Sequence, residues 1–415
     1  MLSANGLTAG AEDRRERAGK DMGRKGLLLF GILAFFLLLS GTASAGFVQI
    51  PAGTQVIGEE AFFGDLTLDH VALPEGLKRI ESKAFAYSSA KLINLPSTLE
   101  YIADDAFEGC TGIEINGVRG DNNAYKWGRS HGYCRRFVAL LIGEAEFYGY
   151  DEQGRWTRVD WADRNVGDVL RMSEMLNRVY TPNLTAFEVF QRTDRSYEEV
   201  HDDIQAAFSD TMPQDVCWFF IATHGDSDGD GDLSLVDNTF LSFTTLASWL
   251  KAATPAPVAV ILESCGAGSA ILGNGADAED EEAMRNFTRR AISAFAAADT
   301  GTAFSNSTGD MRIKGKFYVL AAAAHHQLSW GFESDKAHDY ENSSNYFTCW
   351  LLEGIGHAWN APGDISPRDG TLTLNEVFRY VQKYNTYQIS SEGEYYSQYV
   401  QCYPEGSDYR LVRHY

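Results

Sequence analysis

The stretches VCWFFIATHG, residues 216–225, and VAVILESCGAGS, residues 258–269, decide the fold of this chain. Each begins with an unbroken apolar run, which is typical of a strand covered on both faces of a parallel sheet. Each then reaches a side chain capable of chemistry, His224 in the first and Cys265 in the second. If the two strands are neighbours, about 4.8 Å apart, both side chains emerge at the same edge of the sheet. An imidazole and a thiol together there suit acyl transfer, with the backbone N–H groups of Gly225 and Cys265 as candidate oxyanion donors.

The residues on either side of these stretches continue an alternation of strands and helices. Further apolar runs lie at residues 137–142, 187–190 and 317–324, and helix-like stretches lie at 168–179, 197–208, 244–252 and 281–295. Strands that alternate with helices predict a mostly parallel sheet with helices on both faces. We therefore expect a three-layer α/β domain at residues 134–415.

An internal repeat precedes this domain. The pairs Ile50-Pro51, Leu73-Pro74 and Leu95-Pro96 recur at a spacing of about 22 residues, and Ala-Phe pairs at 61–62, 84–85 and 106–107 keep the same period. Each unit can bury its Ala-Phe pair only by stacking on the next unit, as in a solenoid. The sequence predicts a short solenoid at residues 46–133.

The first 45 residues have the three parts of a secretory signal peptide. A charged segment ends at Arg24-Lys25, an apolar run extends from Leu27 to Leu39, and Ala43-Ser44-Ala45 follows. The apolar run is shorter than the roughly 20 residues that span a membrane. We expect residues 1–45 to be removed, leaving a secreted or cell-surface protein with no membrane segment; an uncleaved anchor is the alternative. The formal net charge of −22 disfavours a nucleic-acid partner.

The six cysteines are irregularly spaced, in domains large enough to fold without disulfides. We expect most of them to be small buried apolar side chains, with Cys265 the exception.

The two motifs resemble those of a known clan of peptidases. His224-Gly225 and the sequence ESCGAGS at residues 263–269 resemble the paired motifs of caspases, metacaspases, legumain and clostripain. The resemblance covers residues 135–412 and implies a caspase-like sandwich in which His224 and Cys265 form the catalytic dyad of a cysteine endopeptidase. The repeats resemble the BspA-like class of leucine-rich repeats. Such modules usually bind a surface or a protein ligand; a spacer or folding cap is the equal alternative.

The substrate residue on the amino side of the cleaved peptide bond is expected to be basic. Glu263 lies two residues before Cys265, so it points to the same face of the strand, and in the clan this position helps to form the pocket for that residue. A carboxylate attracts Arg or Lys. The chain lacks the Gln-Ala-Cys sequence of caspases, which argues against their aspartate specificity. In legumain, Glu at this position accompanies a preference for Asn, and Arg164 is close in sequence to Asp168, so Asn is the second choice.

Three more residues are candidates for substrate binding. Asp168, in a Gly-Asp-Val context that resembles the metacaspase Asn-Asp-Ala, is either a second acid of that pocket or a helix cap. Ser329-Trp330 resembles the Ser-Trp pair that lines the caspase cleft, and a core tryptophan is the alternative.

The loop after His224 has the oxygen ligands of a calcium loop at Asp226, Asp228 and Asp230, the first, third and fifth positions. No helix leads into it, which favours a solvated acidic turn. The catalytic dyad itself requires no cofactor, so calcium is the one candidate for a bound cofactor. A similar stretch at residues 369–376 is interpreted as a turn that caps a helix over 376–384.

Two other functions fit the same residues. The chain could be a non-catalytic cell-surface protein that binds through its repeats, although the intact His224 and Cys265 argue against this. It could also be a transpeptidase of the clan, which transfers the acyl group to an amine instead of water. The expected partner of the enzyme is a peptide or protein substrate.

Overall fold

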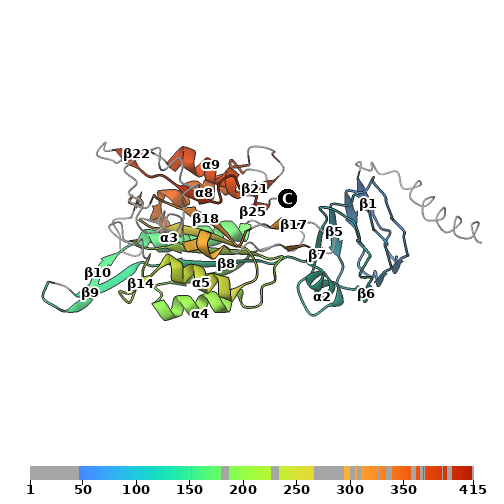
Figure 1. The fold of residues 1–415 in the computed structure, drawn as a ribbon, viewed down its shortest axis with the longest axis horizontal. Coiled ribbons are helices and arrows are strands. Elements are labelled where there is room, and N and C mark those ends of the chain that lie inside the picture. Colours follow the sequence, from blue (N-terminus) through green and yellow to red (C-terminus); the bar gives the residue numbers. More distant parts are fainter. Residues whose placement is uncertain are drawn as a thin grey trace, which may run out of the picture.

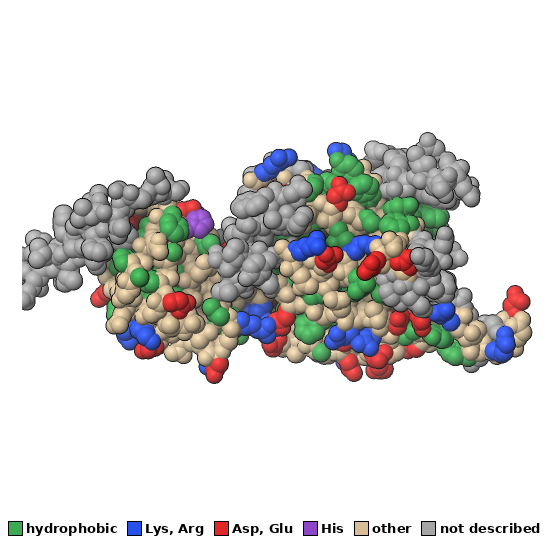
Figure 2. All heavy atoms as spheres, turned by 180° about the vertical axis from the view of Figure 1, so that it is seen from behind, with side chains coloured by type: hydrophobic (Ala, Val, Ile, Leu, Met, Phe, Trp, Pro, Cys, Tyr) green, Lys and Arg blue, Asp and Glu red, His purple; other side chains and the backbone are tan. Residues whose placement is uncertain are grey.

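The computed structural model consists of a repeat solenoid beside an α/β body (Figure 1). It describes residues 46–150, 152–178, 187–225, 233–265, 294–299, 304–305, 311–313, 315–324, 327–332, 339–356, 361–364, 368, 370–385, 387–389 and 395–413. The signal-peptide prediction therefore lies outside the described residues. Acidic and basic side chains are intermixed on the face that Figure 2 shows. Across the described ranges, no helix is both long and apolar enough to cross a bilayer.

The solenoid consists of two parallel sheets whose strands come from successive repeats. One sheet has the order β1 (Phe47–Gln49), β3 (His70–Ala72), β5 (Leu92–Leu95) and β7 (Glu114–Gly117), and the other has the order β2 (Val56–Ile57), β4 (Arg79–Ile80) and β6 (Tyr101–Ile102). The phenylalanines of the Ala-Phe pairs stack on one another from repeat to repeat. The ring centroids of Phe62 and Phe85 are 5.0 Å apart, and those of Phe85 and Phe107 are 5.3 Å apart. The repeat prediction is confirmed, and helix α2 (Asn123–Ser130) closes the stack.

A six-stranded sheet forms the centre of the α/β body. Its order is β11 (Phe187–Thr193), β8 (Phe137–Gly143), β12 (Val216–Ala222), β15 (Val258–Glu263), β18 (Phe317–Ala321) and β24 (Gln401–Tyr403). The first five strands are parallel and β24 is antiparallel. Alternate side chains of β8 enter the two apolar cores on opposite faces of the sheet, which is why its sequence is apolar throughout.

Helices cover both faces of this sheet, so the predicted three-layer arrangement is confirmed. One face packs against α4 (Tyr197–Phe208), α5 (Phe243–Ala253) and α7 (Ala294–Ala298), and the other against α3 (Asp163–Arg178), α8 (Tyr346–Ile355) and α9 (Leu374–Asn385). The remaining elements are β9 (Glu146–Tyr150), β10 (Trp156–Trp161), β13 (Leu233–Ser234), β14 (Phe240–Leu241), β16 (Phe304–Ser305), β17 (Met311–Ile313), β19 (Gly331–Phe332), η3 (Tyr340–Asn342), β20 (Ser344–Asn345), β21 (Thr371–Thr373), β22 (Tyr387–Ile389), β23 (Tyr395–Ser397) and β25 (Arg410–Arg413).

Two sequence expectations about helix starts have different outcomes. Helix α3 begins at Asp163, so Asp168 lies inside the helix and the interpretation of Asp168 as a helix cap is wrong. The turn before α9 does cap its helix. Thr373 Oγ1 accepts a hydrogen bond from the backbone N–H of Glu376, and the Glu376 carboxylate accepts one from the backbone N–H of Thr373.

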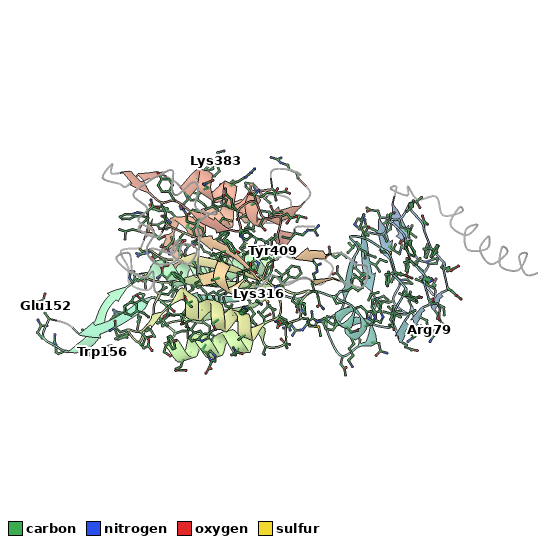
Figure 3. The ribbon with its side chains drawn as sticks, viewed as in Figure 1. Arg79, Glu152, Trp156, Lys316, Lys383 and Tyr409 are labelled. Carbon is green, nitrogen blue, oxygen red and sulfur yellow. The ribbon has the colours of Figure 1, made fainter. Side chains whose placement is uncertain are left out.

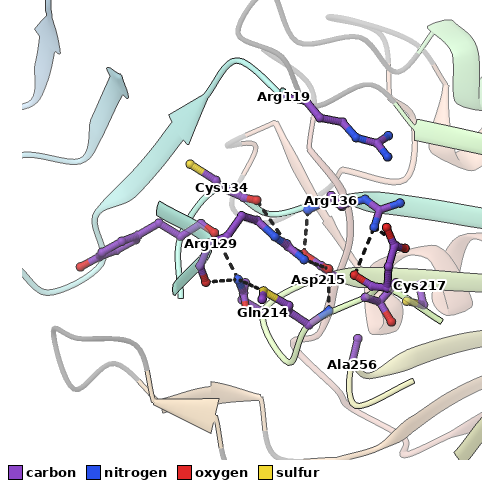
Figure 4. A network of polar contacts seen from close by, with 12 residues as sticks. Arg119, Arg129, Cys134, Arg136, Gln214, Asp215, Cys217 and Ala256 are labelled. Carbon is purple, nitrogen blue, oxygen red and sulfur yellow. Dashed lines mark hydrogen bonds and ion pairs between the residues drawn. The ribbon is translucent and has the colours of Figure 1, made fainter. Parts of the chain in front are cut away.

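A buried ion pair joins the solenoid to the α/β body (Figure 4). The guanidinium of Arg129, in α2, donates two hydrogen bonds to the carboxylate of Asp215, and the one from Nη2 measures 2.7 Å. Asp215 is fully buried and also accepts from the backbone N–H groups of Met212 and Arg136, each at 2.8 Å. Gln214 donates from Nε2 to the carbonyl oxygen of Arg129 at 2.9 Å. The junction is therefore a buried, hydrogen-bonded ion pair that fixes α2 against the amino end of β12.

Replacement of Arg129 by alanine would leave the buried Asp215 without its counter-charge. We expect Arg129→Ala to lower the free energy of unfolding by about 3 kcal/mol. Arg178→Ala is the matched control, because the ion pair of Arg178 with Glu174 has side chains that are 59% and 60% exposed. The control should change the free energy of unfolding by less than about 0.5 kcal/mol. Urea denaturation of both variants measures this, and equal losses would contradict a stabilising role for the junction.

Candidate active site

The pairing of β12 with β15 brings the two predicted catalytic side chains to neighbouring strand ends. Ala222 is opposite Glu263 in the parallel register, and the backbone N–H of Thr223 donates to the carbonyl oxygen of Glu263 at 3.0 Å. His224 and Cys265 are each two residues beyond this last pair. A Cβ atom on Gly225 would lie 2.0 Å from the carbonyl oxygen of Cys265, so only glycine allows the two backbones to be this close. The expectation that these strands are neighbours is confirmed.

The His224 side chain is half-buried against a hairpin that follows β8. Its ring centroid is 4.4 Å from that of Phe147, in β9. The backbone carbonyl of His224 accepts a hydrogen bond from Ser234 N–H at 2.9 Å. The histidine is thus held between β9 and β13.

Cys265 receives a hydrogen bond from the chain that follows β18. The backbone N–H of Ser329 donates to Cys265 Sγ at 3.3 Å. Burial raises the pKa of the Cys265 thiol above its usual value, and the hydrogen bond from Ser329 opposes this shift. The half-buried thiol is therefore protonated until a base removes its proton.

Two buried carboxylates lie in the polar cluster behind Cys265. Glu263 accepts hydrogen bonds from the hydroxyl of Ser329 and from Thr348 Oγ1, the latter at 3.1 Å. Burial, together with the negative charge of Asp168, raises the pKa of Glu263 to about 8. Burial also raises the pKa of Asp168 to about 6, although its carboxylate accepts several hydrogen bonds. These come from Ser344 Oγ at 2.6 Å, Asn345 N–H at 3.0 Å and Asn345 Nδ2 at 2.6 Å. The structure therefore brings Asp168 together with Glu263.

Arg164 adds a positive charge to this cluster. Its charge lowers the pKa values of both Glu263 and Cys265, against the larger effect of burial. Its Cδ atom would be 2.9 Å from a Cβ atom on Gly331, so its side chain lies beside the residue that follows Trp330. The site consequently combines two carboxyl groups with one guanidinium, and the charges of Glu263 and Arg164 both act on the thiol.

Two family models match the chain. Residues 136–392 match the caspase domain, and residues 39–123 match the BspA type leucine rich repeat region, which has six copies. The chain belongs to the caspase-domain family. It carries a caspase-family cysteine peptidase domain behind a BspA-type repeat region, and a peptidase domain implies a protein substrate.

Two solved structures are similar to this caspase-family chain. Protein GSU0716 from Geobacter sulfurreducens is 15% identical with a TM-score of 0.38, over 66% of this chain and 94% of that one. The structure of pro-sf-caspase-1 is 13% identical with a TM-score of 0.38, over 67% of this chain and 90% of that one. At such scores neither likeness bears on activity. No curated protein matches the chain.

Several residues of the site were not revealed by the sequence, among them Ser344, Asn345, Thr348 and Gln398. Gln398 is fully buried, donates from Nε2 to Ser329 Oγ and to the carbonyl oxygen of Ala322, each at 3.0 Å, and accepts from Trp330 N–H at 3.0 Å. It thereby holds the Ser329-Trp330 segment in place, with Trp330 half-buried. No sequence motif surrounds Gln398, so nothing in the sequence could have identified it.

The predicted calcium ligands Asp226, Asp228 and Asp230 lie outside the described residues of the caspase domain. Within the part of the chain that the structure does describe, no group of three or more His, Cys, Asp or Glu side chains could hold a metal ion. Calcium binding stays a prediction. None of the six cysteines, all of them described, forms a disulfide.

The close contact at Gly225 can be tested directly. A Gly225→Ala variant must move its backbone away from Cys265, because the added Cβ atom would overlap the Cys265 carbonyl oxygen. A displacement of about 1 Å between reacting groups slows catalysis about 100-fold, so we expect a loss of this size in kcat/KM on a peptide substrate. Gly58→Ala is the control, since nothing lies within 4 Å of a Cβ atom there. Equal activity of the two variants would contradict the tight contact.

Proposed function

We propose that this protein is a secreted cysteine endopeptidase with Cys265 as nucleophile and His224 as base. The observation that carries the proposal is the alignment of the two strand ends, with Ser329 N–H donating to Cys265 Sγ at 3.3 Å. A hydrogen bond from a backbone donor stabilises a thiolate more than a thiol. The leader-like residues 1–45 support export.

The reaction follows from these positions. His224 takes the proton of the Cys265 thiol, and the thiolate attacks the carbonyl carbon of the substrate amide. Backbone N–H groups of Gly225 and Cys265 stabilise the developing oxyanion. The imidazolium then protonates the leaving amine, and the thioester that remains is hydrolysed by a water molecule that His224 deprotonates. The raised thiol pKa makes the imidazole necessary at neutral pH.

Replacement of the nucleophile tests this proposal. Cys265→Ala and His224→Ala should each reduce cleavage of fluorescein-labelled casein at least about 1,000-fold, because each group of a catalytic unit is needed for the covalent step. Cys110→Ala, in the solenoid, is the matched control and should retain activity. Mass analysis of the products in the presence of glycine amide separates hydrolysis from amine transfer. Full activity of Cys265→Ala would rule out the proposal.

We propose Arg or Lys as the preferred residue before the cut, with Asn second. The support is the pair Glu263 and Asp168, whose buried carboxylates lie behind the nucleophile and would receive a positively charged side chain. Arg164 offsets part of their charge, which is the reason to keep a neutral amide side chain as second choice.

This specificity predicts a pH dependence. The pKa of Glu263 is raised to about 8, so this carboxyl is protonated below pH 8 and ionised above it. The ionised form attracts a cation, so kcat/KM for an Arg peptide should rise relative to an Asn peptide between pH 6 and pH 9. The ratio removes the titration of the dyad, which both substrates share. Two fluorogenic peptides that differ in this one residue measure it, and a ratio that falls with pH would contradict the assignment.

A further inference from the structure

A buried hydroxyl without a hydrogen bond lies directly beside the nucleophile. Ser264, the residue before Cys265, is only 2% exposed, and its Oγ atom has no hydrogen-bond partner among the residues that the structure describes. Such an atom is destabilising, because it has lost its hydrogen bonds to water and gained none in return. The large majority of buried polar side-chain atoms are paired, so this unpaired hydroxyl requires a physical explanation.

The Ser264 hydroxyl is directed at the backbone of Gly225. A Cβ atom on Gly225 would lie 3.2 Å from Ser264 Oγ. Successive side chains of a strand point to opposite faces of the sheet, so Ser264 points away from the face that Glu263 and its hydrogen-bond donors occupy. The hydroxyl is thus separated from the buried carboxyl groups and faces the segment that follows β12.

The backbone N–H and C=O groups of Gly225 point toward β15. Thr223 N–H donates to the Glu263 carbonyl oxygen at 3.0 Å on that side of the segment. The next carbonyl, that of His224, accepts from Ser234 N–H at 2.9 Å on the other side. Amide groups of successive residues in an extended chain alternate between its two sides. Those of Gly225 therefore face the end of β15, where one N–H and one carbonyl oxygen are available next to the nucleophile.

We propose that Ser264 is a positioning residue for acyl transfer: its hydroxyl donates to the Gly225 carbonyl oxygen while the Gly225 N–H donates to the oxyanion. This inference rests on the proposed endopeptidase function. Glycine has no side chain that restricts its backbone, so this hydrogen bond fixes the direction of its N–H. A bond that is absent from the free enzyme and formed in the transition state accelerates the reaction without tightening substrate binding.

The test separates stability from catalysis. Ser264→Ala removes the hydroxyl, and Tyr409→Phe is the matched control, because the Tyr409 hydroxyl is also buried and also lacks a partner in the described part of the chain. Tyr409 stacks on Tyr318 with ring centroids 3.8 Å apart, near Lys316 (Figure 3). Tyr318 is opposite Ala259, five residues and roughly 16 Å before Ser264 along β15. The control is therefore remote from the dyad.

Both variants should raise Tm by about 2 °C, because each removes a buried hydroxyl that no hydrogen bond compensates. Ser264→Ala should also lower kcat about tenfold and leave KM within about twofold of wild type, since the lost bond exists only in the transition state. Tyr409→Phe should leave both constants unchanged. Thermal unfolding followed by circular dichroism gives Tm, and the fluorogenic peptide that the wild type cleaves fastest gives the two kinetic constants.

A lower Tm for Ser264→Ala would mean that the hydroxyl is bonded in the free enzyme, and it would overturn the proposal. An unchanged kcat would also overturn it, as would a loss confined to KM or an equal loss of kcat in Tyr409→Phe. Wild-type protein that cleaves neither peptides nor casein would instead remove the proposed function, and this inference with it.

Discussion

The parallel pairing of β12 with β15 is the constraint on which the rest of this structure depends. Because Ala222 is opposite Glu263, the next residues of both strands leave the sheet at the same level. A shift of one residue would turn the side chains after β15 to the opposite face of the sheet and separate Cys265 from His224. The contact between Gly225 and the Cys265 carbonyl shows how little space this register leaves.

The same register buries the carboxyl group of Glu263, and other groups must replace the hydration that it loses. Burial of an ionised carboxyl group is unfavourable unless hydrogen-bond donors replace water. Three helix and loop segments supply these donors to Glu263 and Asp168, namely Ser329, Ser344-Asn345 and Thr348. Even so, burial keeps the pKa of both groups raised. The hydrogen bonds therefore offset the cost of burying these two acids beside the half-buried thiol only in part.

The sequence predicted those features that arise from local patterns. The repeat period, the apolar strands and the pairing of the two strands that end just before His224 and Cys265 all follow from regularities within short stretches. The contacts that orient the site do not. Gln398 reaches Ser329 from a segment 69 residues away, and Arg129 reaches Asp215 across 86 residues. No spacing rule links such positions, because only the folded sheet brings them together. The local pattern around Asp168 also allows a helix cap for the same reason, since its partners Ser344 and Asn345 are distant in sequence.

The position of the solenoid has a consequence for how the enzyme would face its surroundings. The solenoid is attached at the amino ends of the strands, whereas His224 and Cys265 follow their carboxyl ends, and β8 crosses the sheet in seven residues between them. This separation is roughly 20 Å or more, and Figure 1 shows the repeats and the β9–β10 hairpin at opposite ends of the molecule. A ligand bound by the repeats would therefore lie at the end of the molecule opposite the candidate active site. Repeats fixed to a surface would leave that site facing away from it.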